Sequence, residues 1–365
     1  MKDGKLAVLG NGFAAWTEEL QGYFSGELWW YNGAFLPEIE GLRCCLTESL
    51  AEALTDADAV LLCVETEPID PAVPAQFGVM IPAKGELGIS GFFGSLQAVP
   101  QVLELVEGIA CFAPCAPVIN VSRPMNTTLR ALYDMMPGCR AVGYDGAVHA
   151  ACKRMAALLQ DRGIPADEKE LSYHTAGIGG GAFLGQLAYR QLALRDVFLQ
   201  EVSPIQSDLW QRMEFYPACG DAFLQELCPA GWFAGWEQEP TSVGDRGLAA
   251  LLGALCGESG GVFSGYYPNI GQAPGWETGV IAASDLFCSP QGIRPLVGGE
   301  LPRSLEALFR PQIGMLQTTM EAAVQMEREA AREAFLLEPS LRHLPREKVI
   351  ALFDGLADQY LPDWE

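Results

Sequence analysis

Positive charge is scarce in this chain of 365 residues. Lysine and arginine number 23 against 46 aspartates and glutamates, so the formal net charge at pH 7 is −23. Such a charge repels phosphate backbones and anionic lipid headgroups, so we expect neither nucleic acid nor a membrane as a partner. No apolar run reaches membrane-spanning length, and the first residues, MKDGKLAVLGNG, contain no signal-peptide core. We therefore expect a cytoplasmic protein.

Side chains that bind zinc are few or unsuitably spaced. Histidine occurs three times, and none of the 11 cysteines forms a CxxC pair. An odd number of scattered cysteines, several inside apolar runs, is typical of buried thiols in a reducing compartment. The cysteines thus predict neither a disulfide framework nor a zinc site.

What the chain has is an alternation of strand-like and helix-like segments over residues 1–150. Apolar strand patterns occur at 5–9, 27–33, 58–65 and 116–122, and helical patterns at 14–24, 48–57, 92–107 and 124–136. This order predicts an α/β fold with a Rossmann-like, doubly wound parallel sheet.

The second half of the chain has a different character. Residues 151–365 combine aromatic-rich helices with Gly/Pro-rich connections and end in a long helical tract near 304–336. We predict two domains: a dinucleotide-binding domain over 1–150, and an α+β domain with long helices over 151–365 for substrate binding and oligomerisation. The apolar, aromatic-rich stretch 200–236 predicts self-association as a dimer or tetramer.

A glycine turn follows the first predicted strand. GNGFAA (10–15) fits the looser GxGxxG/A pattern, whose backbone amides face a pyrophosphate at the carboxyl edge of the sheet. The second strand ends in an asparagine where an acidic residue usually holds the ribose, so that contact should be weaker. We expect NAD to bind here, with an unliganded Rossmann-like scaffold as the alternative; the candidate cofactor-binding residues are Gly10, Gly12, Phe13 and Asn32.

Several segments resemble, in order, motifs of the NAD-dependent family-4 glycoside hydrolases. GISGFFGSLQAVP (88–100) is similar to the family's GPGG…ALRTIP motif, and VINVSRP (118–124) is similar to INxTNP. VGYDGAV (142–148) stands in the place of GLCHxV, and AGIGGGAFL (176–184) in that of AGINHxxW. PNIGQAPG (268–275) is similar to PNxGxIxNLP. The resemblance implies sugar chemistry. In the family, NAD⁺ oxidises the sugar at C3, a tyrosine removes the C2 proton, a divalent metal steadies the enolate, and the leaving group is eliminated.

The sequence differs from the family's motifs at the positions of the metal ligands and the basic tyrosine. Asp145 and Gly146 stand at the Cys-His pair of GLCH, and Gly179 and Gly180 stand at the Asn-His pair of GINH. The resemblance places the metal ligands at these positions, so the glycines stand where a ligand is missing. We therefore do not expect a divalent metal, and Asp145 is only a weak candidate ligand. The stretch that should carry the basic tyrosine, SVGDRGLAALLGAL (242–255), contains none.

The candidate catalytic residues are Asp145 and Arg123. Arg123 replaces an asparagine of INxTNP, and its charge suits an oxyanion in place of a metal; a surface ion pair is the alternative. The resemblance leaves two main functions open: NAD-linked chemistry on a sugar or sugar derivative, or an inactive protein that binds NAD or a sugar. An ordinary hydroxyacid dehydrogenase is a weaker third. For the small sugar ligand, the candidate residues are Asn120, Arg123, Tyr267 and Asn269.

Overall fold

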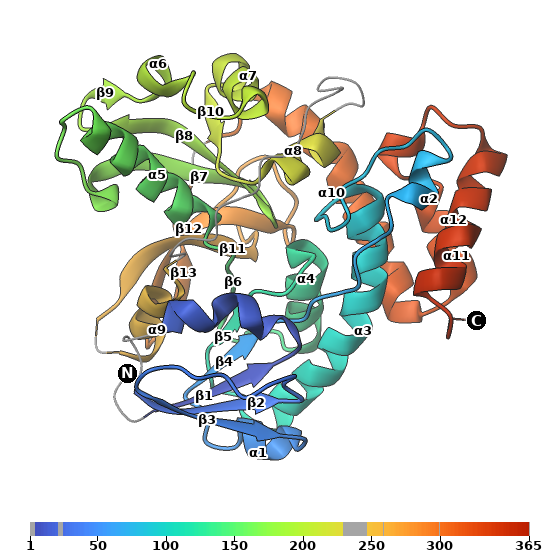
Figure 1. The fold of residues 1–365 in the computed structure, drawn as a ribbon, viewed down its shortest axis with the longest axis horizontal. Coiled ribbons are helices and arrows are strands. Elements are labelled where there is room, and N and C mark those ends of the chain that lie inside the picture. The colour runs from blue at the N-terminus through green and yellow to red at the C-terminus, as the bar shows by residue number, and fades with distance from the viewer. Residues whose placement is uncertain (1–3, 21–24, 229–246, 258, 299, 365) are drawn as a thin grey trace.

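The computed structural model describes residues 4–20, 25–228, 247–257, 259–298 and 300–364. Within these ranges the strands form one 13-stranded sheet, in the order β10-β8-β7-β12-β11-β6-β5-β4-β1-β2-β3, with β13 beside β12 and β9 beside β8 (Figure 1). One sheet therefore runs through both halves of the chain.

The first half of the sheet is parallel, and its order β3-β2-β1-β4-β5-β6 is that of a dinucleotide-binding fold. Its central strands, β1, β4, β5 and β6, are buried almost throughout, which suits parallel pairing, whereas β2 and β3 towards the edge are partly exposed. The predicted Rossmann-like sheet is confirmed. The strands are β1 (Gly4–Leu9), β2 (Gly26–Tyr31), β3 (Leu42–Thr47), β4 (Ala59–Leu62), β5 (Val118–Asn120) and β6 (Ala141–Gly143).

Over the residues that the structure describes, two of the connections between these parallel strands contain no α-helix. The segment after β1 is a 3₁₀-helix, η1 (Gly12–Leu20), and not the expected α-helix. Residues 32–41, which join β2 to β3, contain no helix. The other connections carry α1 (Leu50–Leu54), α2 (Ala72–Ala75), α3 (Gly88–Phe112), α4 (Met125–Met135) and α5 (Ala147–Asp161).

The second half of the sheet is antiparallel and joins the first where β11 pairs with β6. Its strands are β7 (Leu171–Ile178), β8 (Gly181–Tyr189), β9 (Leu192–Ala193), β10 (Phe215–Pro217), β11 (Gly261–Pro268), β12 (Ile281–Ser289) and β13 (Gly292–Pro295). Around it lie η2 (Glu168–Glu170), α6 (Arg195–Phe198), α7 (Pro204–Met213), α8 (Asp221–Leu227) and α9 (Leu248–Cys256). The predicted α+β character is confirmed.

The C-terminal helices are long, but the predicted tract 304–336 is two helices. α10 (Arg303–Gln325) ends at Met326, whose φ of 57° leaves the helical region, and α11 (Arg328–Phe335) follows. α10 lies beside α3, with η3 (Pro339–Leu341) and α12 (Arg346–Tyr360) completing this end of the molecule (Figure 1). The domain boundary at residue 150 falls within α5 and stays a prediction. No helix among the described residues combines the length and apolar character needed to cross a bilayer.

Candidate functional site

The predicted glycine turn lies at the carboxyl edge of the sheet, where β1 and β4 end side by side. The Gly12 amide donates to the Cys63 carbonyl oxygen at 2.7 Å. A Cβ on Gly10, whose φ is +104°, would lie 2.7 Å from that same oxygen, so only glycine allows this approach. Asn11 fastens the turn, because its side chain donates to the Glu65 carbonyl and accepts from the Glu65 amide at 2.9 and 2.7 Å.

The other two predicted cofactor residues lie on either side of this turn. The Phe13 side chain is fully buried, with its ring 5.2 Å from that of Trp30. Trp30 in turn donates from Nε1 to the Gly10 carbonyl at 2.7 Å. The Phe13 side chain therefore supports the turn from within the core. Asn32 is exposed and follows β2 directly, beside the end of β1.

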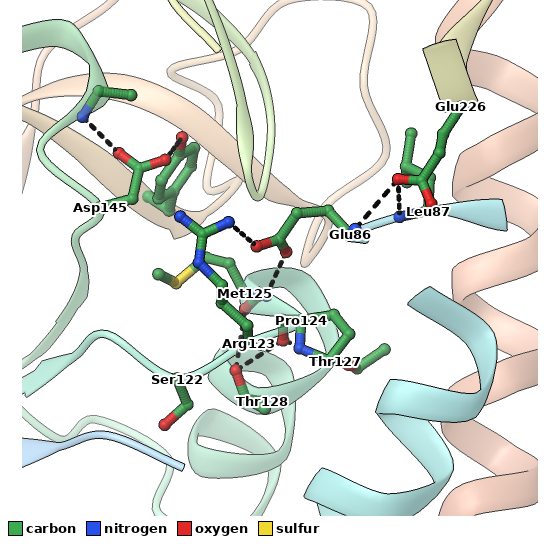
Figure 2. Close-up of polar contacts among 12 residues, drawn as sticks. Glu86, Leu87, Ser122, Arg123, Pro124, Met125, Thr127, Thr128, Asp145 and Glu226 are labelled. Atoms are coloured by element: carbon green, nitrogen blue, oxygen red, sulfur yellow. Dashed lines mark hydrogen bonds and ion pairs between the residues drawn. The ribbon is translucent and has the colours of Figure 1, made fainter. Parts of the chain in front are cut away.

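A cluster of charged side chains lies at the same edge, where β5 and β6 end. Arg123 Nη1 donates to Glu86 Oε1 at 2.9 Å, and Glu86 Oε2 accepts from the Met125 amide at 2.6 Å. The Arg123 side chain is 53% exposed and that of Glu86 only 5%. Figure 2 shows the guanidinium between the carboxylates of Glu86 and Asp145. We call Glu86, Arg123, Asp145 and Tyr266 the Arg123 cluster.

The titration of this cluster follows from its burial. Loss of hydration raises the pKa of the Glu86 carboxyl to about 7, although Arg123 and the Met125 amide act in the opposite direction. Burial also opposes the charge on Arg123, but Glu86 and Asp145 outweigh it and raise the pKa of the guanidinium. Arg123 is thus a permanent cation beside a carboxyl that titrates near neutral pH.

Asp145 is held by two donors at the end of β6. Its Oδ1 accepts from the Ala147 amide at 2.9 Å, and its Oδ2 accepts from the Tyr266 hydroxyl at 2.7 Å. Tyr266, in β11, is buried, and burial together with Asp145 raises the pKa of its hydroxyl well above 10. The Tyr266 hydroxyl therefore stays protonated and serves as a donor to Asp145.

The three consecutive glycines form the tip of the β7–β8 hairpin, and each lies against another part of the chain. A Cβ on Gly179 would lie 2.9 Å from Asn126 Cα, and one on Gly180 would lie 2.6 Å from Glu86 Cγ. A Cβ on Gly181 would overlap the ring of Phe223. The place at Gly180 is therefore taken by Glu86, which the sequence analysis missed. Its only signal was its position two residues before the GISGFFGS motif.

Glu86 is itself fixed by a second buried carboxyl. Glu226 of α8 accepts with Oε2 from the amides of Glu86 and Leu87, both at 3.1 Å (Figure 2). Burial raises the pKa of Glu226 well above 4.5, because the two backbone amides only partly offset the loss of hydration. The N-terminal end of α3, and with it Glu86, is thereby fastened to α8.

The residues at the expected metal position do not fit a metal ion. Gly180 offers no side-chain ligand, and the charge that lies beside Asp145 is the cation Arg123. Over the described part of the chain, no group of three or more His, Cys, Asp or Glu side chains is placed to hold a metal.

The predicted sugar-binding residues are only partly brought together. Asn120 is buried, donating to the Thr128 hydroxyl at 3.1 Å and accepting from the Ser122 amide. Asn269 is buried as well, and its amide group bonds only backbone groups of residues 271–277. Both asparagines stabilise loops. Tyr267 is half-buried and packs edge-on against Tyr133.

A cavity of about 60 Å³ lies beside the Arg123 cluster. Its wall includes Glu65, Lys84, Ser90 and Arg123. A second cavity, of about 290 Å³, lies between α4 and α10. Two parts of the predicted segments lie outside the described residues. They are the end of the aromatic-rich stretch 200–236, from residue 229 on, and residues 242–246, with which SVGDRGLAALLGAL (242–255) begins.

Two family models match the chain in sequence order. The model described as "Family 4 glycosyl hydrolase" matches residues 40–161, and the one described as "Family 4 glycosyl hydrolase C-terminal domain" matches residues 192–341. Together they span more than half of the chain. It belongs to family 4 of the glycosyl hydrolases. The resemblance drawn from the motifs is thus confirmed.

Individual family-4 relatives match over nearly the whole chain. An alpha-galacturonidase of Thermoanaerobacter italicus is 22% identical, with 99% of this chain and 98% of that protein covered. The crystal structure of the Bacillus subtilis protein lplD superposes with a TM-score of 0.85 at 21% identity, covering 98% of this chain and 100% of that chain. A Thermotoga maritima 6-phospho-beta glucosidase, solved with manganese, NAD⁺ and glucose-6-phosphate, has a TM-score of 0.79 at 13% identity, with 99% of both chains covered.

Proposed function

We propose that this family-4 glycosyl hydrolase acts on a glycoside of a sugar acid, with Arg123 as the fixed cation in place of a metal. The Glu86–Arg123–Asp145 arrangement at the carboxyl edge carries the proposal. A guanidinium binds a carboxylate through paired N–H donors, and Lys84, which pairs with Glu65, lines the same cavity. The alpha-galacturonidases among the relatives favour the same substrate class.

The glycine turn is the proposed NAD site. The backbone at Gly10 and Gly12 would face the pyrophosphate, and Asn32 would face a ribose hydroxyl. Bound NAD⁺ would supply the acceptor for a hydride from a sugar carbon. The Gly10 backbone lies so close to the Cys63 carbonyl, just after β4, that a Cβ on Gly10 would clash with it, and this close packing supports the assignment.

The residues of the Arg123 cluster have separate roles in the proposed reaction. Asp145, oriented by the Tyr266 hydroxyl, accepts the proton from the carbon next to the sugar carbonyl. Arg123 stabilises the negative charge that then develops on the carbonyl oxygen. Loss of one such electrostatic stabiliser costs on the order of 10²–10³ in rate. Glu86 positions Arg123 and does not contact the substrate, since it is almost fully buried.

The experiment measures release of an aryl group from an aryl α-galacturonide in the presence of NAD⁺, with either EDTA or Mn²⁺ added. We expect the same rate under both conditions and about a 10²–10³-fold loss in Arg123→Met. The control is Arg212→Met, because the Arg212 side chain is 69% exposed, pairs with Asp208 within α7 and should leave the rate unchanged. Turnover that EDTA abolishes and Mn²⁺ restores would refute the metal-free assignment.

A second candidate function is a non-catalytic protein that binds a sugar acid. The observation favouring it is the Glu65 side chain, which lies against Gly12 where the pyrophosphate of NAD would approach. Its signature is galacturonate binding that Arg123→Met abolishes, without turnover under any condition tested. Calorimetric titration with galacturonate, run beside the rate assay, separates the two functions.

A further inference from the structure

The glycine turn carries a carboxylate that the dinucleotide-binding pattern does not include. A Cβ on Gly12 would lie 2.6 Å from Glu65 Cγ and 3.2 Å from Glu65 Cδ. Because Asn11 bonds both the amide and the carbonyl of Glu65, the backbone of this residue is fixed beside the turn. The side chain therefore covers Gly12 from the ligand side.

An ion pair with Lys84 holds this carboxylate in place. Lys84 Nζ lies 2.9 Å from Glu65 Oε2, and both side chains are about half exposed. An ion pair this open to water is weak and easily exchanged. The two residues line the cavity that also contains Arg123, so the pair lies between the glycine turn and the proposed substrate site.

A carboxylate at this position disfavours binding of a diphosphate at the glycine turn. The two groups carry like charge and would share the same few ångströms of space, and like charges in contact disfavour binding. The turn offers little to compensate, since the Gly12 amide already donates to Cys63 and η1 is a 3₁₀-helix. The rest of the turn keeps the backbone closure that a dinucleotide needs.

We propose that Glu65, held by Lys84 across the glycine turn, is the residue that sets the affinity of this chain for a dinucleotide. The inference rests on the proposed NAD site. NAD⁺ must displace the carboxylate from Gly12 before its pyrophosphate reaches the turn. The natural protein therefore binds NAD⁺ weakly, and removal of the charge at residue 65 strengthens binding.

The test is calorimetric titration of the full chain with NAD⁺ alone, comparing the natural protein with Glu65→Gln and Glu65→Ala. We expect the Kd of Glu65→Gln to fall tenfold or more, and that of Glu65→Ala to fall at least as far, because alanine also removes the bulk. The matched control is Glu67→Gln, which removes an exposed carboxylate from the same cavity without touching the turn, and its Kd should stay within twofold.

Two results would overturn the inference: an unchanged or higher Kd in Glu65→Gln, or no NAD⁺ binding by any of the proteins. Circular dichroism and thermal melting without NAD⁺ verify that each variant is folded. The sugar-acid site is measured separately by titration of the natural protein with galacturonate. Tight NAD⁺ binding by Glu65→Gln without glycoside turnover would support the role of Glu65 and contradict the proposed hydrolase.

Discussion

Glu86→Gln removes one ionisable group from the interior and leaves the shape of the side chain nearly unchanged. In the natural protein, burial raises the pKa of this carboxyl from 4.5 to about 7. A carboxyl whose pKa is higher in the folded state favours folding while it is protonated. This contribution is complete below pH 4.5 and is lost as the pH rises through about 7.

The size of the effect follows from the same two pKa values. Each pKa unit corresponds to about 1.4 kcal/mol, so ionisation of Glu86 costs the folded state about 3 kcal/mol once the titration is complete. The part that falls between pH 5 and pH 8 is about 2.5 kcal/mol. Relative to Glu86→Gln, the free energy of unfolding of the natural protein should decrease by this amount over that interval.

The assay is urea unfolding followed by tryptophan fluorescence at several pH values from 5 to 8, for both proteins. The range begins at pH 5 because the isoelectric point is near 4.5, where solubility is lowest. All other titrating groups occur in both proteins and cancel in the difference. Glu67→Gln, which changes an exposed carboxylate, is the control and should follow the natural protein at every pH.

The result that would refute this reasoning is a constant difference between the natural protein and Glu86→Gln from pH 5 to pH 8. It would mean that Arg123 and the Met125 amide stabilise the Glu86 carboxylate as well as water does. A difference that grows in the opposite direction would mean that the ion pair outweighs burial. Either outcome would remove the near-neutral titration from the Arg123 cluster.

Two further predictions concern the hairpin tip and the assembly. Gly180→Ala should lower the free energy of unfolding by about 2–4 kcal/mol, because φ is +79° and the new Cβ would meet Glu86. Gly314 lies at an exposed position inside α10 with open space around it, so Gly314→Ala should raise the free energy of unfolding by about 0.5–1 kcal/mol. Urea unfolding of both variants measures this, and equal effects would contradict it. Light scattering at micromolar concentration should find a dimer or tetramer, and a monomer would contradict the predicted self-association.

The sequence predicted the elements whose signals are local. The apolar runs of β1 and β4 and the glycine turn between β1 and η1 were recognisable because strand burial and tight turns leave patterns within a few residues. The break between α10 and α11 was missed, since Met326 has no glycine or proline beside it to mark the end of a helix. Nothing in the residue pattern of 12–20 distinguished a 3₁₀-helix from an α-helix.

The Arg123 cluster was predicted only in part, for a different reason. Arg123 and Asp145 lie in motifs, but their partners are far along the chain: Glu86 is 37 residues from Arg123, and Tyr266 is 121 residues from Asp145. Such contacts depend on how α3 and β11 meet the carboxyl edge of the sheet, and no window of sequence contains both members of either pair. Asn120 and Asn269 were named from their motif positions, and sequence alone did not indicate that the fold buries both and holds them by hydrogen bonds to neighbouring segments.

The residues of the Arg123 cluster and the hairpin tip depend on one another. A side chain at residue 180 would begin with a Cβ only 2.6 Å from Glu86 Cγ, so the present position of the Glu86 side chain requires glycine there. Glu86 in turn needs Arg123, because a buried carboxylate without a partner is strongly destabilising. Gly180, Glu86 and Arg123 therefore depend on one another in this fold, and a substitution at any one of them should disturb the other two.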